Sequence, residues 1–112
     1  MTRTFYRVCL SDPPTRIDFV PASVLKPGRR APQNPALRDL WEFGVSVLAT
    51  EDAARRKALG WAPEFPLGEY IACLAIPDGS SVTAQKTLGP GHYTLRGDPE
   101  AMLSSVVSTA HV

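Results

Sequence analysis

The stretch FGVSVLATEDAARRKALG, from Phe43 to Gly60, decides the fold of this chain. Its first part, Val45–Ala49, is rich in β-branched residues and predicts a strand. Thr50 then stands at an N-cap position, acids follow in the first turn, and basic residues precede Gly60. Because acids suit the N-terminal end of the helix dipole and bases the C-terminal end, this order predicts a helix. A strand followed directly by a well-capped helix anchors the predicted fold.

Apolar and β-branched runs on both sides of this unit predict the remaining elements. Short helices are expected at Pro35–Trp41 after Asn34 and at Pro99–Leu103 after Asp98. At Ile17–Leu25 a short helix is favoured, and a strand broken at Pro21 is the alternative. We therefore predict one small α+β domain, residues 1–112, with five or six short strands in a mixed or antiparallel sheet and three or four short helices. The other expected strands are Thr4–Leu10, Glu69–Ile76, Val82–Leu88, His92–Leu95 and Ser105–Val112.

Composition excludes several functional classes. The chain has 112 residues, 44% of them hydrophobic, and a formal net charge of +1. So small a net charge argues against a nucleic-acid binder, which usually carries a basic face. No run approaches the roughly 20 apolar residues of a membrane span, so we expect no membrane segment and a cytoplasmic protein. Cys9 and Cys73 lie in apolar, strand-like runs, so we expect buried free thiols, with a disulfide between neighbouring strands as the alternative. They form no CxxC motif, so we expect no metal site.

The segment GPGHYTLRGDP, Gly89–Pro99, contains the sharpest local motif. Two glycines flank a proline just before His92, and glycine allows a backbone to approach a ligand closely. A histidine in such a turn can act as a general acid or base because its pKa lies near neutrality. The alternative is an ordinary hairpin turn with a histidine on the surface.

Two further residues, Arg7 and Ser46, stand out inside predicted strands. Arg7 can clamp a phosphate or carboxylate, or it can belong to the polar face of a half-exposed strand. Ser46 interrupts an apolar run; it can serve a nucleotide site or bond to neighbouring backbone. Its context is not the GxSxG of a nucleophile elbow. Nothing in the spacing supports a triad of Ser46, His92 and an aspartate.

Charged groups elsewhere in the chain are interpreted as solvated. The basic group Arg55–Lys57 lies on the predicted helix, and a second basic group, Lys26, Arg29 and Arg30, lies in a loop. The alternative for each group is a phosphate-binding patch. Glu64 and Glu69 lie around a segment rich in proline and glycine and are interpreted as loop acids, with a catalytic carboxylate as the alternative.

The sequence also resembles a known family. Arg7 on a first strand, then FGVSVLATEDAARRKA, then an apolar strand, is similar to the core of ADP-ribosyltransferase-like proteins, including small bacterial members. The resemblance implies that NAD is the cofactor, that Arg7 contacts its phosphates or ribose, and that Ser46 shapes the nicotinamide pocket. Tyr6, Arg7 and Tyr93 are then the candidate cofactor-binding residues, and Arg7, Ser46 and His92 the candidate catalytic residues. The family's late glutamate has no counterpart in GPGHYTLRGDP, which implies a degenerate active site.

Three functions therefore stay open. The first is an accessory or interaction protein without a cofactor, paired with a partner encoded by a neighbouring gene or with a second copy of itself. An exposed apolar patch would favour it. The second is an NAD-using ADP-ribosyltransferase-like enzyme or toxin, favoured by a cleft that joins Arg7, Ser46 and His92. The third is an RNA-processing domain using His92 and Arg96, which needs a basic groove around them.

Overall fold

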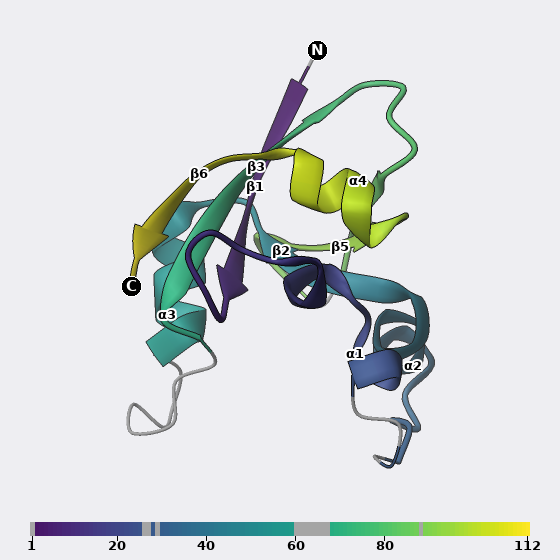
Figure 1. The fold of residues 1–112 in the computed structure, drawn as a ribbon. Helices are drawn as coiled ribbons and strands as arrows, with labels where there is room; N and C mark the ends of the chain where they lie inside the picture. The colour runs from purple at the N-terminus through teal and green to yellow at the C-terminus, as the bar shows by residue number, and fades with distance from the viewer. Residues whose placement is uncertain (1, 26–27, 29, 60–67, 88) are drawn as a thin grey trace.

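A single antiparallel sheet of six strands organises the part of the chain that the structure describes (Figure 1). The structure is a computed structural model that describes residues 2–25, 28, 30–59, 68–87 and 89–112. The strand order is β4-β5-β2-β1-β3-β6. The strands are β1 (Thr2–Cys9), β2 (Gly44–Leu48), β3 (Tyr70–Pro77), β4 (Thr83–Lys86), β5 (His92–Arg96) and β6 (Val106–His111).

Short helices connect and cover these strands. They are a 3-10 turn η1 (Arg16–Phe19) and the α-helices α1 (Ala22–Leu25), α2 (Pro35–Phe43), α3 (Glu51–Leu59) and α4 (Pro99–Ser104). The predicted α+β fold, with its antiparallel sheet and short helices, is confirmed. Among the residues that the structure places, no helix has the length and apolar character needed to cross a bilayer.

Helix starts agree with the caps expected from the sequence. Thr50 Oγ1 accepts a hydrogen bond from the Ala53 amide at 3.1 Å, which begins α3. Asp98 accepts from the Glu100 amide at 3.1 Å and so begins α4. The predicted end of α3 at Gly60 lies outside the described residues.

The segment Ile17–Leu25 differs from its prediction. A single short helix was expected, but the chain forms η1 and then α1, with extended backbone at Val20 (ψ 136°) between them. The cause is Pro21, because a proline disfavours helical backbone in the residue before it.

The sheet consists of two halves that meet at one point. β1 pairs with β3 along its whole length, from Thr2↔Pro77 to Cys9↔Tyr70. β2 pairs with β5 from Gly44↔Arg96 to Leu48↔His92. Between β1 and β2 the only register pair is Tyr6↔Leu48. The two strands therefore part beyond Tyr6, and the backbone groups that face the gap need partners other than a β-ladder.

The two faces of the sheet are covered by different elements. α3 packs across β1, β2 and β3, with Leu48, Ala54 and Ile71 buried beneath it. The main core lies on the other face, where η1 and α4 contact each other. Its largest fully buried side chains are Phe5, Phe19, Leu74, Leu95, Met102, Val47 and Cys9.

Both cysteines are free thiols in the structure, Cys9 buried and Cys73 half-buried. Cys9 is buried in the main core, and burial, more than any neighbouring charge, raises the pKa of its thiol to about 12. It is therefore a packing residue rather than a nucleophile.

Candidate functional site

Ser46 lies in the middle of β2, where β1 and β2 part. Its neighbours Val45 and Val47 are buried in the main core. Since successive side chains of a strand point to opposite faces, Ser46 points to the face that carries α3. Its side chain is half-buried and lines two hollows, one of about 570 Å³ and one of about 170 Å³.

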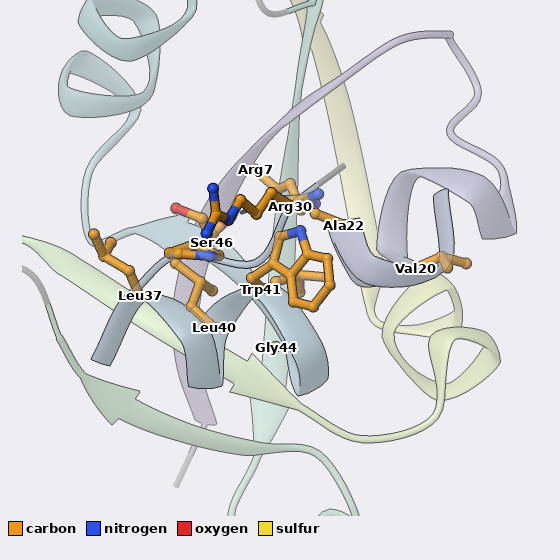
Figure 2. A pocket seen from close by; sticks show the side chains of 11 residues that line it. Arg7, Val20, Ala22, Arg30, Leu37, Leu40, Trp41, Gly44 and Ser46 are labelled. Carbon is orange, nitrogen blue, oxygen red and sulfur yellow. Dashed lines mark hydrogen bonds between the residues drawn. The ribbon is translucent and has the colours of Figure 1, made fainter. Parts of the chain in front are cut away.

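The larger hollow, here named the Trp41 hollow, lies between β2 and the helices α1 and α2 (Figure 2). Trp41 and two leucines of α2 form an apolar wall, and the Arg7 and Arg30 side chains reach into the same space. The smaller one, the Lys57 hollow, shares Arg7 and Ser46 with it. No described lining residue of either hollow carries a carboxylate. The lining is Arg7, Val20, Ala22, Arg30, Pro32, Leu37, Leu40, Trp41, Gly44, Val45 and Ser46 for the first, and Arg7, Val8, Ser46, Leu48 and Lys57 for the second.

Arg7 bridges the gap between β1 and β2. Its Nη1 donates to the carbonyl oxygen of Ser46 at 2.6 Å, and its Nε donates to the carbonyl oxygen of Asp18 at 2.6 Å. The side chain thus replaces a ladder bond that the parted strands cannot make. A guanidinium has five N–H donors, so three remain for a ligand. Burial lowers the pKa of Arg7, although an arginine remains charged in proteins.

The carboxylate of Asp18 fixes the chain beside Arg7. It accepts hydrogen bonds from the amides of Leu10 at 2.8 Å and Thr15 at 2.9 Å. Its charge favours the cationic form of Arg7 less strongly than burial opposes it. Because these oxygens bond to backbone amides, Arg7 forms no ion pair with a described carboxylate.

His92 lies at the start of β5, and its Nε2 is 2.5 Å from Ser46 Oγ. On the other side of the ring, Nδ1 lies 3.1 Å from the carbonyl oxygen of Thr87 and 2.9 Å from its hydroxyl. A carbonyl can only accept, so Nδ1 carries the proton and Nε2 accepts from the Ser46 hydroxyl. Burial, and then the charge of Lys57, lower the pKa of His92, which is therefore neutral at pH 7.

The alternative of a surface histidine is wrong, because His92 is only 9% exposed. Gly89 and Gly91 have positive φ angles of 113° and 73°. This left-handed backbone, which glycine adopts without strain, turns the chain so that His92 enters β5 beside Ser46.

Lys57 completes the group, and the sequence interpretation missed it. Its Nζ donates to Ser46 Oγ, and burial, followed by the charge of Arg7, lowers its pKa. We expected the whole Arg55–Lys57 group to be solvated, but of these three residues only Arg56 is exposed. Helical spacing is the sequence feature that indicates its position. Lys57 follows the buried Ala54 by three residues and therefore lies on the helix face that packs on the sheet.

The remaining predicted site residues lie elsewhere. Tyr6 packs with Leu48 and Ile71 beneath α3, and Tyr93 packs on Phe5 in the main core at a ring distance of 5.2 Å. Neither lines the hollows. Glu69 is exposed, and Glu64 lies outside the described residues.

Arg96 is not brought to His92. It occupies the opposite end of β5, where it forms a 2.5 Å ion pair with Asp39 and lies over the ring of Phe43. The basic groove that an RNA-processing domain needs is therefore not formed by these two residues.

The cluster of Arg7, Ser46, Lys57 and His92 offers two kinds of chemistry. Its cations can hold an anionic group, because both have N–H donors to spare and neither forms an ion pair with a described carboxylate. Its serine hydroxyl lies between an imidazole that can take its proton and an ammonium that can stabilise its oxygen. Comparisons with known protein families, with curated proteins and with solved structures found no match to this chain.

Replacing Lys57 with methionine is expected to raise the pKa of His92, because the positive charge that helps to lower it is removed. NMR titration of the ring C–H signals of His92 measures this change. Arg56→Met, which removes the neighbouring exposed charge, is the matched control and should leave the titration unchanged.

The same depressed pKa makes stability depend on pH. The unfolded chain binds a proton at His92 near pH 6.5, and the folded chain binds it only at lower pH. The contribution of neutral His92 to the free energy of unfolding is therefore complete above pH 6.5 and is lost as pH falls toward the pKa of His92 in the folded chain. Urea unfolding of wild type and His92→Gln at several pH values in this window gives the free energy of unfolding at each pH. This free energy should change less with pH in the variant, and an equal change in both chains would contradict a lowered pKa of His92.

Proposed function

We propose that this chain binds NAD in the Trp41 hollow, as an ADP-ribosyltransferase-like protein with a degenerate catalytic set. One observation carries the proposal. Arg7 and Lys57 both donate hydrogen bonds to Ser46, Arg7 and Ser46 line both hollows, Lys57 lines the smaller one, and no described carboxylate lines either hollow.

The charge arrangement favours a phosphate-bearing ligand. Two half-buried cations close to one another repel, as the effect of Arg7 on the pKa of Lys57 indicates. An anion between them would remove that repulsion. Arg7 offers three unused N–H groups and Lys57 two, and Arg30 extends into the same hollow (Figure 2). The pyrophosphate of a dinucleotide matches this set of donors.

The walls of the Trp41 hollow favour a ligand that also carries a flat ring. Trp41 supplies an aromatic surface, and Leu37 and Leu40 supply apolar ones. The volume of about 570 Å³ lies within the roughly 300–1,000 Å³ of small-molecule and cofactor sites. Trp41 Nε1 is buried and has no acceptor among the described residues, so it is a further donor in the wall.

The proposal concerns binding and includes no transfer step. The family's glutamate has no counterpart in the Gly89–Pro99 segment, and the described lining supplies no other carboxylate. The interaction-protein alternative stays a prediction. It requires an apolar patch. Exposed apolar side chains lie on α1 (Val24 and Leu25) and on α2 (Leu37 and Phe43), which pack against each other, and others lie singly, such as Leu59 on α3.

A thermal-shift titration tests the proposal. NAD at a hundredfold excess over its dissociation constant should stabilise the chain by about 2.7 kcal/mol. Inorganic pyrophosphate should give a smaller shift and adenosine, which has no phosphate, almost none. Lys57→Met should reduce the NAD response, and Arg56→Met, which removes the adjacent exposed charge, should not. A flat response to NAD by the folded wild-type chain would overturn the proposal.

A further inference from the structure

We infer that Ser46 is an activated nucleophile, with His92 as its general base, and that it cleaves small carboxylic esters that carry a negative charge near the ester bond. This activity goes beyond NAD binding and does not rest on it.

The geometry fulfils the two conditions for an activated serine. The nucleophile must bond to a base, and Ser46 Oγ lies 2.5 Å from His92 Nε2. A third group must orient the base, and the Thr87 carbonyl accepts from Nδ1–H at 3.1 Å. The Thr87 hydroxyl supports this arrangement through a 2.8 Å bond to the Thr94 hydroxyl. Thr87 therefore takes the place that an aspartate has in the familiar triad.

Lys57 distinguishes this serine from one that merely bonds to a histidine. Its ammonium donates to Ser46 Oγ, so positive charge lies beside the oxygen as the oxygen loses its proton. Its two other N–H groups, with the free N–H groups of Arg7, can stabilise the oxyanion of a tetrahedral intermediate. The same cations give the preference for a substrate with a negative charge.

The reaction balances with water as the second reactant. Ser46 Oγ attacks the ester carbonyl carbon, and its proton passes to His92 Nε2. The intermediate collapses, the bond to the alcohol oxygen breaks, and the alcohol leaves with the proton from Nε2. Water then attacks the acyl carbon with His92 again as base, which releases the acid and restores the serine hydroxyl.

Ser46 is also accessible to small molecules. It is half-buried and lines both hollows, so an ester can approach it from the Trp41 hollow while Lys57 lies on the other side. Its strand neighbours Val45 and Val47 are held in the main core, which fixes the position of the serine backbone.

A fluorophosphonate probe tests the inference, since it reacts only with activated serines and loses fluoride when it forms the phosphonate ester. The wild-type chain should gain one adduct, which peptide mass spectrometry places on Ser46. Ser46→Ala should gain none, and His92→Gln should react about 100-fold more slowly. Ser104→Ala, at an exposed serine of α4, is the matched control and should react like wild type.

Two further measurements separate a chemical role from a structural one. The labelling rate should fall as pH drops through the pKa of His92, and Lys57→Met should move this fall to higher pH. Hydrolysis of 4-nitrophenyl hydrogen succinate should exceed that of 4-nitrophenyl butyrate. A folded wild-type chain without an adduct on Ser46, or equal labelling of wild type and His92→Gln, would overturn the inference whatever the NAD titration shows.

Discussion

Replacing Arg7 with lysine is expected to weaken NAD binding by about 30-fold or more, which corresponds to about 2 kcal/mol. A lysine keeps the charge but loses the planar fork. It cannot satisfy the carbonyls of Asp18 and Ser46 and still present paired N–H groups to a phosphate. Isothermal titration calorimetry at fixed salt measures the loss. The matched control is Arg56→Lys, at an exposed position of α3, and it should bind like wild type.

Arg7→Lys should also reduce the free energy of unfolding, because a buried carbonyl left without a donor costs about 1–3 kcal/mol. Binding must therefore be measured at a temperature where circular dichroism shows the variant folded. Unchanged affinity in the folded variant would remove Arg7 from the ligand site and leave it only its role between the strands.

The second large effect is expected in the core. Phe5→Ala should lower the free energy of unfolding by about 3–5 kcal/mol, since it leaves a cavity at a side chain that is only 2% exposed. It also removes the partner on which the Tyr93 ring packs. Because the free energy of unfolding of a native protein is typically about 5–15 kcal/mol, this loss brings the chain close to unfolding.

Urea denaturation at 25 °C measures the change. Val107→Ala is the control, because Val107 is 65% exposed on the edge strand β6 and its truncation should cost no more than about 0.5 kcal/mol. Equal losses in both variants would mean that Phe5 does not lie in the main core.

Local signals explain why most elements were predictable. The helix Glu51–Leu59 has its cap, its charge order and its preceding strand in one continuous stretch from Gly44 to Leu59, and all of them agree. The strand order was not predictable, because β1 pairs with β3 across some sixty intervening residues. No local pattern encodes that choice.

The residues of the candidate site were predictable in part, because local sequence signals mark three of them. Arg7 and Ser46 stand out as polar residues inside apolar strands, and His92 stands out between glycines. Their meeting depends on the sheet order, which brings β1, β2 and β5 side by side. The resemblance to ADP-ribosyltransferase-like proteins implied that Tyr6 and Tyr93 bind the cofactor. Strand alternation instead turns Tyr93 toward the core and Tyr6 beneath α3.

The bond from Arg7 to the Ser46 carbonyl has a consequence for evolution. Arg7 holds two strands together, so natural selection for folding alone would retain it even in a descendant that had lost every ligand. Lys57 does not hold two strands together, since its only hydrogen bond among the described residues goes to the Ser46 hydroxyl. Among relatives of this chain, conservation of Lys57, rather than conservation of Arg7, therefore distinguishes proteins that still bind the ligand from proteins that have lost it.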